Sequence, residues 1–158
     1  MKVLGALAVA ICCYLAGCSF SAKQKASCAN LHGIIRLLTH MQSRIKNSAM
    51  PLAEIFASFS DDALEKCGFL PELRLHGAAG FANALSMLDL PPDCSDALEL
   101  FGGTLGTLCA EDQLSELALV LGEMTEHYGR AVKALPTKQK ITRTVWGLAG
   151  ALIAIMLI

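Results

Sequence analysis

The last third of the chain carries an apolar pattern that changes character at Pro136. Before this proline, apolar residues recur at alternating steps of three and four, which places them along one side of a helix. They are Leu114, Leu117, Leu121, Met124, Tyr128, Ala131 and Leu135. Pro136 is predicted to end this helix, because proline lacks an amide proton and clashes with the preceding turn. The apolar seam fits packing within its own domain or packing against a partner.

The residues after Pro136 predict a membrane anchor. Lys138, Lys140 and Arg143 form a basic collar, and residues 145–158 contain no charged residue. Positive charge stays on the cytoplasmic side of a membrane, so a collar on the N-terminal side of the tail predicts that the preceding domain is cytoplasmic. We expect residues 141–158 to form a C-terminal transmembrane helix.

A second apolar segment, residues 3–22, is uncharged and long enough to span a hydrocarbon core. Three hypotheses compete for it: an uncleaved anchor, a cleaved signal peptide and a lipoprotein signal. The third rests on residues 15–18, Leu-Ala-Gly-Cys, which are similar to a lipobox in which Cys18 is acylated. Because the basic collar argues against export, we favour an anchor over residues 1–22 and a cytoplasmic helical domain over residues 23–140.

Within the middle domain, the apolar residues follow helical periodicity. Residues 23–47 carry a stripe made of Leu31, Ile34, Ile35, Leu38, Met41 and Ile45. No segment alternates with a period of two, and β-branched residues are few, so strands are not expected. We predict an all-α fold, a bundle of about five or six helices between the two anchors.

Turn and capping residues divide this domain into short helices. The predicted boundaries are, in chain order, a start near Pro51, a cap at Ser60-Asp61-Asp62, a stop between Gly68 and Pro71, a break between Gly77 and Gly80, a rigid connector at Leu90-Pro91-Pro92-Asp93, a cap at Ser95-Asp96 and a break across Gly102-Gly103-Thr104-Leu105-Gly106. The long C-terminal helix is expected after the last break.

The charges are segregated along the chain, although the net charge is only −1. All fourteen acidic residues lie between Glu54 and Glu126, opposed there only by Lys66 and Arg74. The flanking segments hold only basic charges, which is typical of segments lying against an anionic inner leaflet. The acidic helices, including Asp89, Asp93, Asp96 and Glu99, are expected to face protein partners. Loose clustering of charges on solvated faces is the alternative, and a nucleic-acid partner is not expected.

Residues that suggest chemistry are sparse. Cys28, His32, Arg36 and His40 follow at four-residue steps on one helical face, but Arg36 interrupts the row and no carboxylate accompanies it. The glycine-rich segment 102–106 lacks the Gly-Lys-Ser/Thr ending of a phosphate loop and follows no predicted strand. We therefore predict no catalytic, cofactor-binding or metal-binding residue.

Four cysteines lie outside the N-terminal apolar segment. Cys28, Cys67, Cys94 and Cys109 show neither the pairing of a metal site nor a short disulfide spacing. We expect them to be small buried residues in a reducing compartment.

The C-terminal half resembles the stage III sporulation protein AB family of endospore-forming bacteria. The resemblance lies in Phe101 to Gly106, Gln113, Lys138, Lys140, Thr144, Trp146-Gly147-Leu148 and Gly150. The N-terminal anchor and the turn at Pro51-Leu52 fit the same layout. This chain departs from the family at Cys109, where an acidic residue is usual, and at Asn83, where an aromatic residue is usual.

The resemblance implies an all-α cytoplasmic domain similar to the platform protein of type II secretion and type IV pilus machines. It also implies a place in the mother-cell membrane complex that builds a channel to the forespore, with a secretion-type ATPase among the partners. Our leading hypothesis is a non-enzymatic membrane platform or adaptor that is required for sporulation. The alternative is an exported, lipid-anchored binding protein acylated at Cys18, and a metal-dependent enzyme is a distant third.

Overall fold

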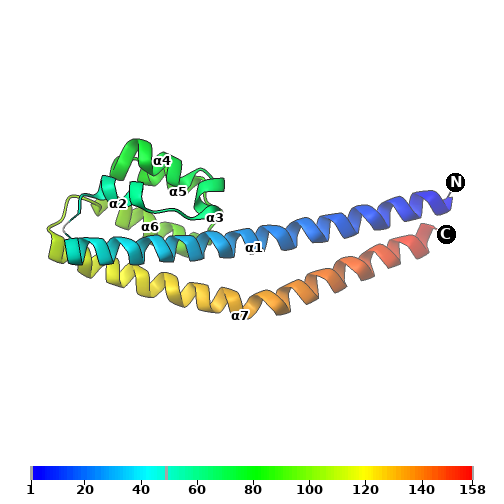
Figure 1. Ribbon diagram of the computed structural model, residues 1–158. Helices are drawn as coiled ribbons and strands as arrows, with labels where there is room; N and C mark the ends of the chain where they lie inside the picture. The colour runs from blue at the N-terminus through cyan, green and yellow to red at the C-terminus, as the bar shows by residue number, and fades with distance from the viewer. Residues whose placement is uncertain (1, 49, 158) are drawn as a thin grey trace. The chain divides into compact units, whose positions relative to one another are not determined.

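The computed structural model describes the backbone of residues 2–48 and 50–157, and the side chains of most residues between 22 and 134. Every element in this part of the chain is a helix, which confirms the predicted all-α fold (Figure 1). The elements are α1 (Lys2–Ser48), α2 (Leu52–Ser58), α3 (Asp62–Lys66), α4 (Phe69–His76), the 3-10 helix η1 (Gly77–Gly80), α5 (Phe81–Ser86), α6 (Pro92–Thr104) and α7 (Ala110–Leu157).

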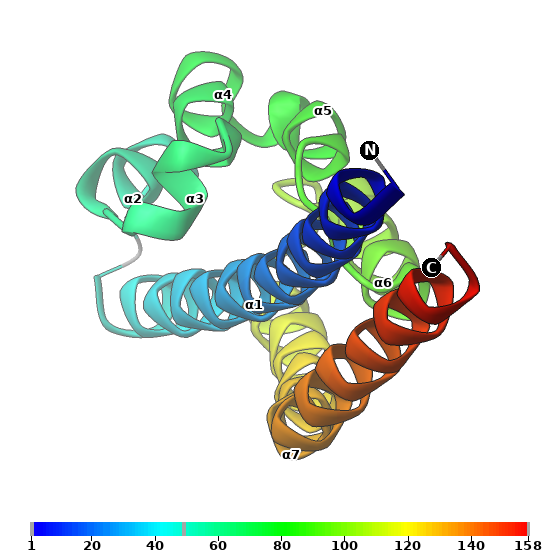
Figure 2. The same ribbon diagram turned by 90° about the vertical axis from the view of Figure 1, so that its right-hand side faces the viewer.

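The chain forms two compact units. The larger, Ala26–Arg130, contains the second half of α1, the short helices and the first part of α7; the other comprises Met1–Lys25 and Ala131–Ile158. In the larger unit the short helices α2 to α5 follow one another in an arc along one side of α1 (Figure 2). The candidate sites described below lie in this larger unit.

Of the two predicted membrane anchors, residues 1–22 and 141–158, residues 2–22 lie in α1 and residues 141–157 lie in α7. Nearly all of their side chains lie outside the described residues. Among the residues that are described, no helix is long and apolar enough to cross a membrane. The two anchors and the domain boundaries that depend on them therefore stay predictions.

The core of the larger unit is built around the apolar stripe of α1. Leu31, Ile34, Leu38 and Met41 are at most 1% exposed, as the periodicity predicts, and Leu37 joins them. Three phenylalanines, one each from α4, α5 and α6, also belong to this core. Phe81 contacts both Phe69 and Phe101 edge to face, with ring centroids 5.9 and 6.1 Å apart.

The seam of α7 packs within its own domain, which decides between the two alternatives left open by the sequence. Leu117 and Met124 are fully buried, and Leu121 and Tyr128 are partly buried against the same core. Val120, which is not a seam position, is also buried. The described part of the seam is thus a packing face within the helical bundle.

Two of the predicted helix boundaries at polar and glycine residues are correct. The side chain of Asp61 accepts hydrogen bonds from the amides of Ala63 and Leu64, so it caps α3. Gly68, with φ of +88°, separates α3 from α4, and the left-handed conformation there favours glycine. Pro71 lies in the first turn of α4, where its missing amide proton costs nothing.

The predicted cap at Ser95-Asp96 is wrong. Helix α6 begins at Pro92 with Pro91 as its N-cap residue, and Ser95 and Asp96 lie within the helix. The reason is that proline is well suited to a first helical position, because its φ is already helical and that position has no hydrogen bond to lose. The start of α6 therefore moves one turn toward the N-terminus.

The glycine-rich run is only partly a break. Helix α6 continues through Gly102 and Gly103 to Thr104, and the chain leaves the helix at Leu105, before Gly106 with φ of +82°. An ideal Cβ on Gly102 would lie 2.5 Å from Cδ1 of Phe81, so a glycine is needed there for close packing against α5. The helix break expected across this run is therefore wrong at residues 102–104 and begins only at Leu105.

The prediction that Pro136 ends the packing helix is also wrong, because α7 is one helix from Ala110 to Leu157. A proline in a helix interior removes one hydrogen bond and costs roughly 3 kcal/mol. Good helix formers on both sides, among them Ala134 and Lys138, favour continuation. The local cost therefore does not stop the helix.

Candidate functional site

The outer row of α1, defined as Cys28, His32, Arg36 and His40, is the first candidate site. The structure gives each of its polar members a different partner. The His32 ring stacks on Tyr128 of α7 with centroids 5.2 Å apart, and the Arg36 guanidinium pairs with Asp61 of the α2–α3 connection at 2.6 Å. Since the partners lie on different elements, the row does not converge on one point.

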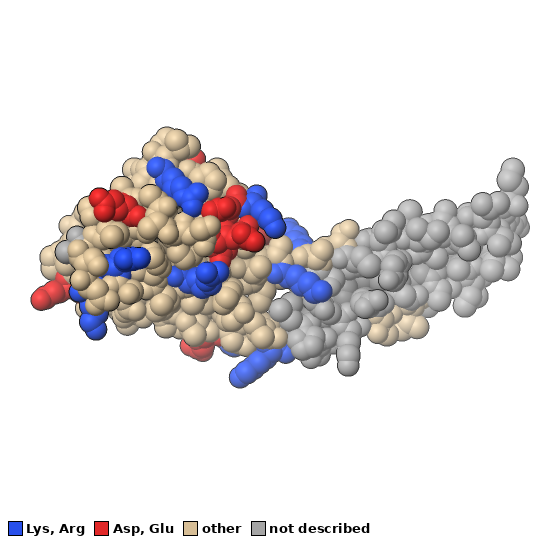
Figure 3. Space-filling view, viewed as in Figure 1, with Lys and Arg blue, Asp and Glu red and all other residues tan. Residues whose placement is uncertain are grey.

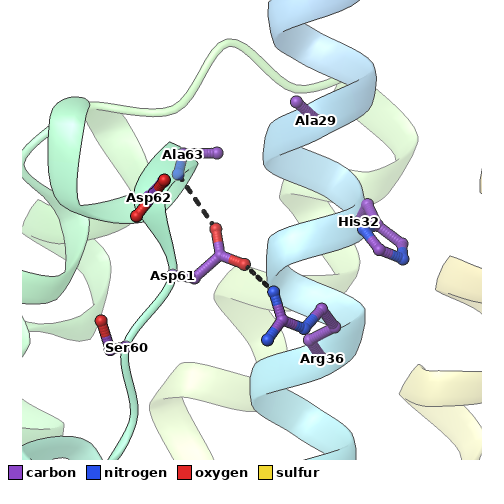
Figure 4. A pocket seen from close by; sticks show the side chains of 7 residues that line it. All are labelled: Ala29, His32, Arg36, Ser60, Asp61, Asp62 and Ala63. Atoms are coloured by element: carbon purple, nitrogen blue, oxygen red, sulfur yellow. Dashed lines mark hydrogen bonds and ion pairs between the residues drawn. The ribbon is translucent and has the colours of Figure 1, made fainter.

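A hollow of about 460 Å³ lies beside this row, between α1 and the start of α3. Its lining residues are Ala29, His32, Arg36, Ser60, Asp61, Asp62 and Ala63 (Figure 4). In the close-up, Arg36 reaches toward Asp61 while His32 points away from that pair. One Asp61 oxygen caps α3 and the other accepts from Arg36, so both charged groups are already used by the fold.

His40 closes the row at its other end. Its Nε2 lies 3.2 Å from Oγ of Ser58, and its ring lies against Phe59 at 5.5 Å between centroids. Burial, with the nearby charge of Arg44, lowers the pKa of His40. This environment favours a neutral imidazole that packs between α1 and the end of α2.

The segment between α2 and α3 is held by a second set of bonds. Arg74 of α4 donates to the Phe59 carbonyl at 2.7 Å and to Glu65 at 3.1 Å, and the Ser60 hydroxyl also donates to Glu65. Hydrogen bonds from Ser60 and Arg74 lower the pKa of Glu65. Together with the Arg36–Asp61 pair, they tie the short helices to each other and to α1.

The described side chains offer no assembled chemistry at these positions. Among them, no group of three or more histidine, cysteine or acidic residues is arranged to hold a metal ion. The four described cysteines are free thiols, and only Cys94 is fully buried. The expectation that Cys109 is buried is wrong: it is exposed at the start of α7 and its thiol donates to Asp112 at 3.1 Å.

The second candidate site is the outer surface shared by α6 and α7. The Thr104 hydroxyl donates to a Glu116 carboxylate oxygen at 2.8 Å, which joins the C-terminal end of α6 to α7. At the other end of α6, burial and the charges of Asp93 and Glu123 raise the pKa of Cys94, and Arg130 opposes them. Glu116 of α7 therefore lies at the C-terminal end of α6, and the later residue Glu123 lies near the N-terminal end of α6. The two helices are antiparallel.

Two exposed leucines flank this contact. Leu100 is 73% exposed and lies one turn before Thr104 on the same side of α6; Leu119 is 76% exposed and lies one turn after Glu116 on α7. At a rise of about 1.5 Å per residue, Leu100 lies about 6 Å from Thr104 along α6, and Leu119 lies about 4.5 Å from Glu116 along α7. Because the helices are antiparallel, both displacements from the Thr104–Glu116 bond run in the same direction. The two leucines therefore stand at nearly the same level, one on each helix.

Acidic residues surround the two leucines. Asp96 and Glu99 of α6 and Glu123 of α7 are exposed, and Glu116 is half-buried. We call the six residues Asp96, Glu99, Leu100, Glu116, Leu119 and Glu123 the α6–α7 face. On its α6 side a hollow of about 460 Å³ opens over Gly103, lined also by Asp96, Glu99, Leu100 and Thr104.

The exposed surface of α1 has the opposite charge. Lys23, Lys25, Arg36 and Lys46 are exposed along it, and Figure 3 shows Lys and Arg side chains following α1 while acidic side chains gather beside it over the short helices. No large apolar residue is exposed on the described part of α1. The domain thus presents a basic, polar surface on α1 and an acidic, partly apolar one on α6 and α7.

These elements define an all-helical protein whose compact unit, Ala26–Arg130, includes parts of the two long helices α1 and α7. The chain belongs to the stage III sporulation protein AB family, whose model matches residues 2–72 and 78–158. The resemblance inferred from the sequence is therefore confirmed, and the family implies a role in stage III sporulation. No curated protein and no solved structure matches the chain.

The sequence predicted part of the α6–α7 face. The acidic residues Asp96 and Glu99 were expected to face partners, and the structure places both in the exposed part of α6. The two leucines were not predicted, because a single apolar residue on a polar helical face gives no signal in the sequence. Their position at nearly the same level appears only when α6 is placed against α7.

Proposed function

We propose that this protein is a non-enzymatic membrane platform or adaptor of the stage III sporulation complex, which forms a channel between mother cell and forespore. Its domain lies on the cytoplasmic side of the mother-cell membrane around the forespore, held by anchors at residues 1–22 and 141–158. There it docks other members of the complex, including a secretion-type ATPase. Membership in the sporulation family supports the setting of this proposal.

The observation that carries the proposal is the order of charge along the two long helices. Helices α1 and α7 each run without interruption from the compact unit Ala26–Arg130 into the terminal segments. Basic residues mark the transition on both sides, at Lys23 and Lys25 and again from Arg130 onward. Basic residues beside uncharged helices favour an inner-leaflet position, and they leave the acidic helices directed at protein partners.

Protease accessibility of the domain in sporulating cells tests the proposed placement. Protease added to intact protoplasts should leave residues 26–130 uncut, whereas protease added after the membrane is opened should cut within the exposed connection between α6 and α7. Cleavage in intact protoplasts would refute a cytoplasmic domain. Deletion of the gene should block spore formation, and the full-length gene should restore it.

The lipobox-like residues 15–18 support the one alternative that has an observation of its own. If the chain were an exported lipoprotein, radiolabelled palmitate would enter it and Cys18→Ala would abolish the label. We expect no label in either protein. A label that is lost on Cys18→Ala would replace the platform proposal with the lipoprotein.

A further inference from the structure

We propose that the α6–α7 face binds a basic amphipathic helix from a second protein, whose apolar side covers Leu100 and Leu119. This inference rests on the proposed function and names the chemistry of the partner. The argument uses the position of the two leucines, the charge around them and the absence of exposed large apolar residues on the described part of α1.

The two leucines are suited to one helical partner. Single exposed leucines are common on protein surfaces and need no explanation. Here two leucines stand at the same level on neighbouring antiparallel helices, each about three-quarters exposed, with the Thr104–Glu116 bond at their base. A helix laid along the line between α6 and α7 would cover both with successive apolar residues spaced three or four apart.

Two glycines leave room for such a helix. An ideal Cβ on Gly103 of α6 or on Gly122 of α7 would meet no atom within 4 Å in the described part of the chain. Glycine weakens a helix interior, and no neighbour in this unit requires it at either position. Gly122 lies one turn after Leu119, so the surface beside that leucine is low enough for close helix approach.

The charge selects the partner's chemistry. Asp96 and Glu99 make no hydrogen bond or ion pair among the described residues, so their charge is available. An acidic rim repels the anionic inner leaflet and nucleic acid, which removes a lipid surface and a nucleic acid as occupants. Lysine and arginine residues that flank an apolar stripe complement both the rim and the two leucines.

The described part of α1 does not supply this combination. The exposed face of α1 has the required positive charge, at Lys25, Arg36 and Lys46, but no large apolar residue of its described part is exposed. The apolar residues of α1 are buried in its own domain. A basic amphipathic helix of a different protein supplies both the positive charge and the apolar side, and an adduct to this chain itself is the outcome that would assign the face to a second copy instead.

Site-specific photo-crosslinking in sporulating cells tests the inference with the full-length chain. Benzoylphenylalanine replaces Leu100 or Leu119, and replaces Leu75 of α4 as the control, because Leu75 is 77% exposed but lies outside the face. We expect adducts from positions 100 and 119 to one helical segment with lysine or arginine beside an apolar stripe, and none to that segment from position 75. Adducts to lipid, to this chain itself or to an acidic segment would overturn the proposal, as would no adduct.

Serine substitutions give a second, independent measurement. Leu119→Ser should lower the adduct yield from position 100 by roughly tenfold or more, because a buried leucine contact is lost. Asp96→Lys together with Glu123→Lys should lower it further, while Leu75→Ser should leave it unchanged. Circular dichroism of each purified variant verifies that the helices remain folded.

Spore yield separates this inference from the proposed function. Leu100→Ser with Leu119→Ser should reduce the yield at least tenfold while the protein remains in the membrane fraction. A normal yield from this folded variant would overturn the inference and leave the platform proposal standing. Failure of the protease test would remove the platform proposal regardless of the α6–α7 face.

Discussion

The outer face of α1 and the outer face of α6 have opposite charges and different relations to the fold. Both present polar and charged residues at helical spacing. On α1, Arg36 is paired with Asp61 and His32 is stacked on Tyr128, so these groups hold the domain together. On α6, Asp96 and Glu99 have no such partner in the described part of the chain. A charged face is evidence for an external partner only where the fold leaves its charges unused.

The largest expected effect on stability distinguishes two adjacent glycines of α6, Gly102 on its packed side and Gly103 on its open side. Gly102→Ala should lower the free energy of unfolding by about 2 kcal/mol, because the new methyl group would overlap the fully packed Phe81 ring. Gly103→Ala should instead raise it by about 0.5–1 kcal/mol, because its Cβ meets open space in a helix interior.

Urea titration of the full-length chain in detergent, followed by circular dichroism, measures both values. Opposite signs for two adjacent glycines would confirm that one is needed for packing and the other is not. Equal effects would show that Gly102 has no special packing role.

The next largest effect on stability is expected at Asp61, which caps α3 and pairs with Arg36 of the outer row of α1. Asp61→Ala should cost about 1.5 kcal/mol, most of it from the lost cap of α3 and less from the ion pair, since Arg36 is half exposed. Asp62→Ala is the matched control, because Asp62 is exposed and makes no cap bond. A loss of equal size at both positions, measured by the same titration, would contradict this assignment.

Charge removal on α6 should have a small effect on stability. Asp96→Asn with Glu99→Gln should change the free energy of unfolding by less than about 0.5 kcal/mol, because neither residue has a bonding partner in the described unit. The same titration measures the change. A loss above 1 kcal/mol would mean that the fold uses these charges, and the contrast between the two faces would fail.

The smallest expected effect is the pH dependence contributed by His40. Because its pKa is lowered in the folded state, the unfolded chain takes up the proton first as the pH falls below 6.5. Stability is therefore complete above that pH and decreases below it, by less than about 0.5 kcal/mol because the ring is partly solvated.

His40→Gln should flatten this part of the stability profile between pH 7 and pH 5, and His76→Gln on the exposed side of α4 is the control for the substitution itself. A profile that keeps its slope without His40 would assign the effect to another group.

The sequence by itself determined the family, the all-α fold and most of the core. Leu31, Ile34, Leu38 and Met41 were predicted from a 3.6-residue period, which depends only on the geometry of a helix and the burial of apolar side chains. Asp61 was recognised as a cap for a similar reason, since a cap acts within a few residues of itself. Pro136 misled because a local cost of a few kcal/mol is outweighed by the rest of the helix, and Ser95-Asp96 misled because Pro92 is better suited to begin α6.

Only the tertiary structure decided which polar residues are used within the domain. The pairing of Arg36 with Asp61 spans 25 residues, and no local pattern specifies it. That Leu100 and Leu119 stand at nearly the same level likewise depends on how α6 packs along α7, which is set by the Thr104–Glu116 bond and the buried residues beneath. Contacts between distant segments arise from the packing of whole helices, so the sequence supplied the acidic residues of the α6–α7 face and the fold supplied its apolar centre.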